Sequence, residues 1–86
     1  MAVQNITKTL YRITFDTQEY FAYANCFDDA IRNTVKDMAL GRYSLSQWNG
    51  PYKNEAGHIE AQCRVKSSKT RVNFVIYAEA IEPKTY

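Results

Sequence analysis

The chain has few of the residues from which metal sites, catalytic histidine pairs and phosphate-binding loops are built. It has one histidine, His58, and two cysteines, Cys26 and Cys63, that form no CxxC pattern, which argues against a zinc site. Its three glycines are scattered, which excludes a glycine-rich phosphate-binding loop. No nucleophile accompanies His58 in the sequence, so we expect a solvent-facing histidine, no cofactor and no enzymatic activity.

Long apolar runs are missing as well. The longest is far too short to span a bilayer, so we expect no membrane contact. Two thiols without a secretory signal favour a reducing compartment such as the cytoplasm, with both cysteines buried and unpaired. The 86 residues suit one small domain, and we expect residues 1–7 and 82–86 to be flexible ends.

The clearest pattern that is present lies towards the C-terminal end. Residues 57–66 and 71–81 alternate apolar with polar side chains, which predicts two strands that each bury one face. The polar residues 67–70 connect them, so the pair is a predicted β-hairpin. The residues expected to point into the core are Ile59, Ala61, Cys63, Val65, Val72, Phe74, Ile76 and Ala78.

A second hairpin is predicted from residues 9–15 and 19–24. In its first strand Tyr11, Ile13 and Phe15 share the inward face. Its second strand carries aromatic rings on both faces, and we assign Phe21 and Tyr23 to the core.

Between the hairpins, apolar residues recur at intervals of three and four, which predicts one amphipathic helix over residues 27–40. We expect Asn25 to cap its N-terminus and Gly41 to end it. The order ββαββ gives an α+β fold, a four-stranded antiparallel sheet with one helix packed on one face.

Residues 42–56 form a connection of about fifteen residues, longer than most and often functional at such a length. It carries Tyr43, Trp48 and Tyr52, residue types that anchor many protein interfaces. The triplet Asn-Gly-Pro at 49–51 indicates a turn, so we expect a loop. On the helix-free face, this loop or a partner would cover the apolar strip Val75, Tyr77 and Ile81.

The turn of the second hairpin concentrates positive charge at Arg64, Lys66, Lys69 and Arg71, with no acidic residue among them. Such a cluster predicts contact with phosphates or with an acidic protein surface. The alternative is a charged turn that only keeps the sheet edge soluble. The candidate partner-binding residues are therefore Arg64, Lys66, Lys69, Arg71, Tyr43, Trp48 and Tyr52.

Residues 23–31, YANCFDDAI, have the form of a strand that ends in alanine, a cap and an amphipathic helix. In this junction the chain resembles small phage-encoded inhibitor proteins of the anti-CRISPR type. The resemblance implies a phage or mobile-element accessory protein that inhibits a host defence or nucleoprotein complex in the host cytoplasm by direct binding. The expected binder is a monomer or homodimer. The alternative is a nucleic-acid-binding module that uses the basic hairpin and the aromatic residues of the sheet.

Overall fold

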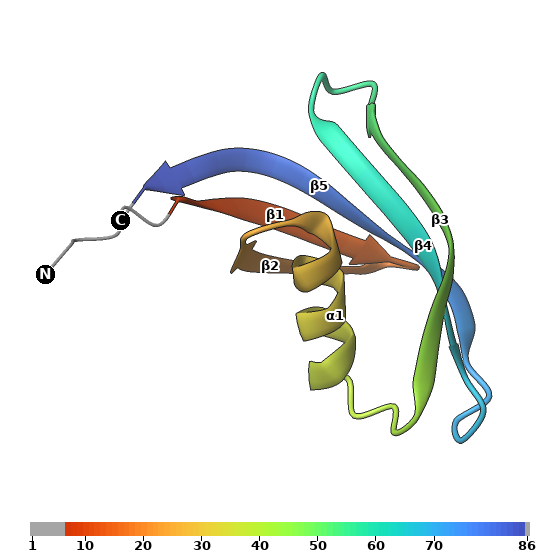
Figure 1. Ribbon diagram of the computed structural model, residues 1–86. Coiled ribbons are helices and arrows are strands. Elements are labelled where there is room, and N and C mark those ends of the chain that lie inside the picture. Colours follow the sequence, from red (N-terminus) through yellow and green to blue (C-terminus); the bar gives the residue numbers. More distant parts are fainter. Residues whose placement is uncertain (1–6, 86) are drawn as a thin grey trace, which may run out of the picture.

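The chain folds as one helix and a five-stranded antiparallel sheet (Figure 1). The computed structural model describes residues 7–85, and the side chains of residues 8–81. The strand order across the sheet is β2-β1-β5-β4-β3. The predicted α+β class is confirmed, but the expected four strands are wrong because part of the expected loop is a fifth. The elements are β1 (Thr7–Phe15), β2 (Gln18–Ala24), α1 (Phe27–Asp37), β3 (Tyr43–Lys53), β4 (Ile59–Ser67) and β5 (Asn73–Thr85).

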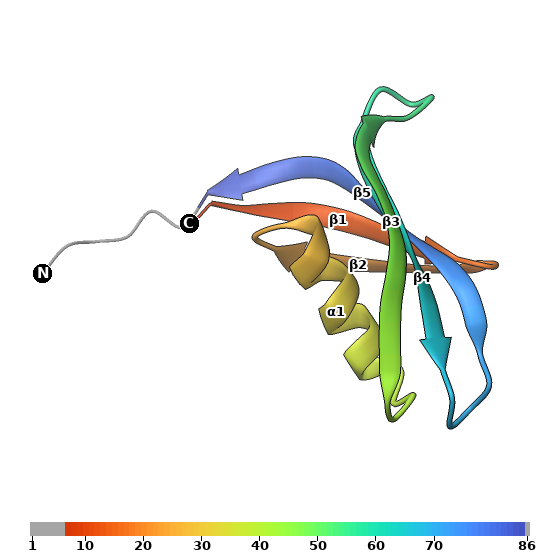
Figure 2. The ribbon, with the colours of Figure 1, turned by 45° about the vertical axis from the view of Figure 1, so that its right-hand side comes forward.

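The sheet is strongly twisted, and α1 lies on one of its faces. In Figure 2 β1 and β2 run across the view while β3 and β4 run down it, with α1 in the angle between the two pairs. The helix packs on β1, β2 and β5. The other face carries no helix among the described residues.

The core lies between α1 and this inner face. Ile31 and Val35 of the helix are fully buried against the sheet residues Ile13, Val65 and Ile76. Burial of such side chains is the main favourable term in folding. The predicted inward stripe of the second hairpin is confirmed for most positions. The exceptions are Val72 and Phe74, half-buried, and Ile59, 44% exposed.

The exposure of Ile59 has a geometric cause. Ile59 is the first residue of β4 and pairs with Ala80 of β5 and Lys53 of β3. This end of the β3–β4 pair extends past α1 (Figure 1), so the helix does not cover it. The alternation predicts the face on which Ile59 lies, but it does not predict how far along β4 the helix covers that face.

The inward face of β2 is the opposite of the predicted one. Tyr20 pairs with Ile13 and Ala22 with Tyr11, and directly paired residues share a face. The helix side of β2 is therefore Tyr20, Ala22 and the buried Ala24. The assignment of Phe21 and Tyr23 to the core is wrong, since Phe21 is 58% exposed and Tyr23 is exposed as well.

The helix begins at Phe27 as predicted but ends at Asp37, before residue 40. Its N-cap is Cys26, without a side-chain cap hydrogen bond, so the prediction of Asn25 as the cap is wrong. At the other end Ala39 takes the first left-handed conformation, with φ 55°, ahead of Gly41. The face of the helix on which apolar residues recur is buried, as predicted, at Ala30, Ile31, Thr34 and Val35.

The predicted loop of residues 42–56 is wrong, because most of it forms the edge strand β3. Its register against β4 shifts between Ser46 and Asn49 and again between Asn49 and Tyr52. Such bulges break the two-residue alternation from which strands are recognised. Gly50 lies in the second irregularity with φ 102°, and an added Cβ would lie 2.8 Å from the carbonyl oxygen of Glu60. Because this segment extends the sheet at its edge, it does not lie over the apolar strip of β5 on the helix-free face. Tyr77 of that strip is 37% exposed.

The last strand continues through Pro83 to Thr85, beyond the predicted end at residue 81. Residues 82–85 pair with β1 up to Thr7 opposite Thr85, whereas pairing with β4 stops at Ala80. Pro83 thus lies where β5 has a neighbour on one side only, a position at which proline is tolerated in a sheet. Residues 82–85, expected as part of a flexible end, are assigned to β5, and residues 1–6 and 86 lie outside the described residues.

The two cysteines differ, although both were expected to be buried. Cys63 is buried in the core and burial raises its pKa to about 11, whereas Cys26 is exposed at the helix start. Because the thiolate is the reactive form, we expect Ellman's reagent to label one thiol rapidly in the native protein and both in denaturant. Cys26→Ser is expected to remove the rapid reaction. Rapid labelling of Cys63 in the native Cys26→Ser variant would contradict this burial.

Candidate functional site

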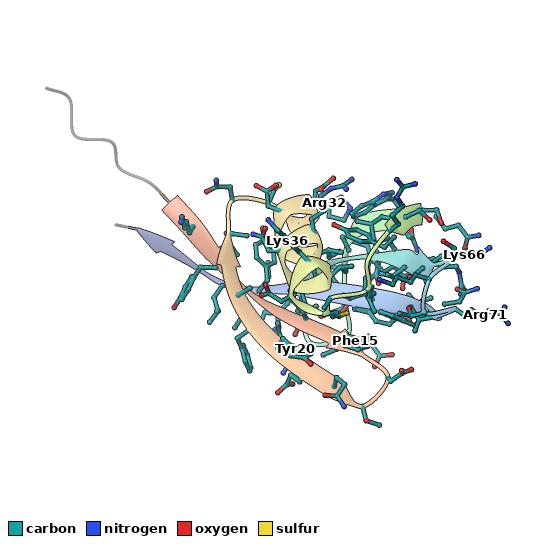
Figure 3. All side chains as sticks on the ribbon, turned by 90° about the horizontal axis from the view of Figure 1, so that it is seen from below. Phe15, Tyr20, Arg32, Lys36, Lys66 and Arg71 are labelled. Atoms are coloured by element: carbon teal, nitrogen blue, oxygen red, sulfur yellow. The ribbon has the colours of Figure 1, made fainter. Side chains whose placement is uncertain are left out.

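Five basic residues gather where the β4–β5 turn meets the α1–β3 connection. Lys66 and Arg71 mark this end of the molecule in Figure 3. Four of the five are the basic residues that the sequence singled out. The structure adds Arg42, which lines a surface depression together with Lys66. We call this surface the basic end: Arg42, Arg64, Lys66, Lys69 and Arg71.

Buried Ser67 holds the two segments of the basic end together. Its hydroxyl donates a hydrogen bond of 2.9 Å to the carbonyl oxygen of Leu40, in the α1–β3 connection. The same hydroxyl oxygen accepts a hydrogen bond of 3.4 Å from the backbone N–H of Thr70, in the β4–β5 turn. A Cβ added to Gly41 would lie 2.9 Å from Cδ of Lys69, so the Lys69 side chain lies against the connection. This contact places Arg42 beside the turn.

The charge of the basic end is uncompensated among the described side chains. The chain has five arginines, and Arg12 and Arg32 pair with the carboxylates of Glu79 and Asp28. No ion pair to a described side chain involves Arg42, Arg71 or the two lysines of the basic end. Arg64 is bound only by neutral groups, with 3.2 Å to Oε1 of Gln47 and 2.7 Å to Oδ1 of Asn73.

The three aromatic residues of the predicted binding surface do not lie together. Tyr43 is half-buried, packs against the core and lines the depression of the basic end. Trp48 is 42% exposed in the middle of the edge strand β3. Tyr52 lies towards the opposite end of β3, where its hydroxyl donates to the carboxylate of Glu60. Tyr43 is therefore part of the basic end, Trp48 flanks it, and Tyr52 belongs to a different cluster.

That cluster follows one row of paired residues across all five strands on the helix-free face. Arg12 of β1 pairs with Glu79 of β5, which in turn pairs with Glu60 of β4. Phe21 of β2 and Tyr52 of β3 complete the row at the two edges. This row cannot be predicted from the sequence, because it depends on the strand order and register, which one sequence does not reveal.

Glu79 is the centre of this row and is only 5% exposed. Its carboxylate accepts hydrogen bonds from the guanidinium of Arg12 and the amide of Asn54, which also donates to Glu60 at 3.2 Å. Nδ1 of His58 lies 3.1 Å from Oε2 of Glu79, so the expectation of a merely solvent-facing histidine is wrong. These contacts fasten the β3–β4 turn to the central strand.

Two pKa shifts follow from this arrangement. Burial alone would raise the pKa of Glu79, but the hydrogen bonds from Asn54, His58 and Arg12 outweigh it and the pKa is lowered. Burial, with the hydrogen bond to Glu60, raises the pKa of Tyr52 to about 12. A carboxylate that stays ionised among three donors is a poor proton acceptor at neutral pH. The cluster is suited to holding the sheet together rather than to acid–base chemistry.

Within residues 7–85 no three histidine, cysteine, aspartate or glutamate side chains are placed to hold a metal ion. The helix of this same region is too short and too polar to cross a bilayer. Comparison with protein-family models, with curated proteins and with solved structures gives no match. The basic end is therefore the feature of the described residues from which a function can be proposed.

Proposed function

We propose that this chain is a small, non-enzymatic binding module that uses its basic end to bind an anionic surface of a host nucleoprotein or defence complex and thereby inhibits it. The observation that carries the proposal is the uncompensated charge at one end of the molecule. Where an arginine serves the fold, as Arg12 and Arg32 do, it is paired with a carboxylate. Arg42 and Arg71 form no such pair with a described side chain, which leaves them available to a partner.

Charge and aromatic contacts would divide the work of binding. Exposed charges accelerate encounter with a surface of opposite sign and select against other partners. A tryptophan that becomes buried in an interface slows dissociation. Trp48, on the edge strand next to the basic end, is the exposed residue of this type. The resemblance of residues 23–31 to phage-encoded inhibitors supports the same class of function, in the host cytoplasm.

A nucleic-acid-binding module is the second candidate. It is favoured by the exposed rings of Phe21 and Tyr77 on the helix-free face, since bases stack on such rings. The row that contains Glu79 and Glu60 crosses the same face, however, and carboxylates there repel phosphates. Nucleic acid would therefore approach the basic end and not the centre of the sheet.

The experiment is an affinity capture from bacterial lysate with a charge-reversed variant. Lys69→Glu with Arg71→Glu is expected to abolish capture of the complex and to slow its association about tenfold or more at low salt, because steering charge is lost. Both side chains are exposed, so the melting temperature should hardly change. The matched control is Lys53→Glu, an exposed lysine at the other end of β3.

Nuclease treatment of the lysate separates the two candidates. Capture that survives nuclease and disappears in the double variant supports an inhibitor that contacts a nucleoprotein complex. Capture of nucleic acid alone, which nuclease abolishes and which brings down no host protein, points to the nucleic-acid-binding module. If the double variant captures the same complex at the wild-type rate, Lys69 and Arg71 only keep the turn soluble and the proposal is wrong.

A further inference from the structure

The basic end contains a shallow, open depression. Its volume is about 270 Å³, and it lies between the first residues of β3 and the last residues of β4. Of its lining residues two are cationic, two are serines and one is a tyrosine whose ring packs against the core, and none is acidic. They are Arg42, Tyr43, Ser44, Lys66 and Ser68.

This combination of groups matches a phosphate. Arg42 and Lys66 supply positive charge, and guanidinium and ammonium groups bind phosphate oxygens through charge-assisted hydrogen bonds. The hydroxyls of Ser44 and Ser68 are the neutral donors that commonly accompany them at nucleic-acid backbones. The absence of a carboxylate among the lining residues leaves this positive charge undiminished.

The lining residues are held by regular structure. Ser44 and Lys66 are directly opposite each other in the β3–β4 ladder, so their spacing is fixed by the sheet. Tyr43 pairs with Ser67 in the next position of the ladder. The hydroxyl of buried Ser67 donates its hydrogen bond to the carbonyl oxygen of Leu40, two residues before Arg42. A site on paired strands requires less ordering when a ligand binds than a site on a loop.

We propose that this depression is a phosphodiester-binding subsite for a nucleic-acid strand. The inference rests on the proposed function and specifies the chemistry of its anionic partner. A nucleic acid fits better than a phosphorylated peptide because the basic end offers five cationic residues. A single phosphate monoester carries only about two negative charges, whereas a strand presents one for every nucleotide.

The test is the salt dependence of binding to a fluorescent single-stranded DNA oligonucleotide. Each phosphate contact to a single strand contributes about 0.7 to the slope of log K against log salt. The double variant Arg42→Ala with Lys66→Ala is expected to make the slope shallower by about 1.4 and to weaken binding at low salt at least tenfold. The matched control removes two exposed lysines outside the depression, Lys36→Ala with Lys53→Ala, and should leave the slope unchanged.

A second readout locates the subsite without relying on affinity. Titration of the ¹⁵N-labelled protein with pyrophosphate should shift and saturate the amide signals of residues 42–44 and 66–68, and the shifts should disappear in the Arg42→Ala, Lys66→Ala variant. Equal slopes for this variant and the lysine control, or pyrophosphate shifts without saturation, would overturn the subsite. Tighter binding of a phosphopeptide of matched length than of the oligonucleotide would overturn the assignment to nucleic acid.

These outcomes are separable from those of the capture experiment. If the protein captures a complex through Lys69 and Arg71 but neither the oligonucleotide nor pyrophosphate binds, the proposed function stands and the subsite is wrong. If pyrophosphate saturates the depression while charge reversal at Lys69 and Arg71 leaves capture unchanged, the subsite stands and the proposed inhibitor is wrong.

Discussion

Replacing Ile31 by alanine is expected to lower the free energy of unfolding by about 2–5 kcal/mol. Ile31 is fully buried on the inner face of α1, and the surrounding strands cannot close the cavity that its truncation leaves. Ile76 of the central strand is equally buried, so Ile76→Ala should cost a similar amount. Urea denaturation followed by circular dichroism measures both.

Ile59→Ala is the matched control for these two substitutions. It removes the same atoms from the same residue type, but Ile59 is 44% exposed at the start of β4. The expected change is within about 0.5 kcal/mol. If Ile59→Ala were as destabilising as Ile31→Ala, the position of α1 over the sheet would have to be revised.

The second large effect is expected at Arg12. Arg12→Met removes the cation that faces the buried carboxylate of Glu79, and the free energy of unfolding should fall by about 2 kcal/mol at neutral pH. Arg32→Met removes a pair of the same type on the helix surface, where the two side chains are 51% and 50% exposed. That control should cost no more than about 0.5 kcal/mol. Equal costs in urea denaturation would show that burial of Glu79 does not strengthen its pair.

The pH dependence of the Arg12 effect has a defined sign. The pKa of Glu79 is lowered in the folded protein, so its contribution to stability is present above the pKa of an unfolded glutamate, about 4.3. It disappears as the pH falls through the lower folded-state pKa. The stability difference between wild type and Arg12→Met should therefore be largest near neutrality and shrink in acid. A difference that grows below about pH 4 would contradict the ionised state of Glu79.

The sequence predicted those parts of the fold in which local period and burial agree. In the second hairpin apolar and polar residues alternate, and in α1 apolar residues recur every three to four positions. Both patterns identify most of the buried residues. The face of β2 was misassigned because aromatic residues occur on both sides of the strand, and only the register against Ile13 decides between them. The strand β3 was missed because two irregularities and the Gly50–Pro51 pair interrupt its alternation.

The candidate site was predictable where its residues are neighbours in the chain. Lys66, Lys69 and Arg71 belong to one turn, whereas Arg42 joins them only through the contact between the α1–β3 connection and Ser67. A loop over residues 42–56 could place Tyr52 beside the basic residues, and for that reason the sequence predicts them as one site. Once that segment is a strand, its two ends lie at opposite ends of β4, and Tyr52 falls beside Glu60.

The strand order has a consequence for how the chain is made. The β1–β2 and β3–β4 hairpins and α1 are all synthesised before β5, yet β5 is the strand that separates and joins the two hairpins. Until it emerges, the inner edges of β1 and β4 have no partner, and unpaired edges of this kind invite aggregation. The two hairpins therefore cannot join into one sheet until β5 has been synthesised. A substitution that destabilises β5 should reduce the yield of soluble protein before it changes any binding surface.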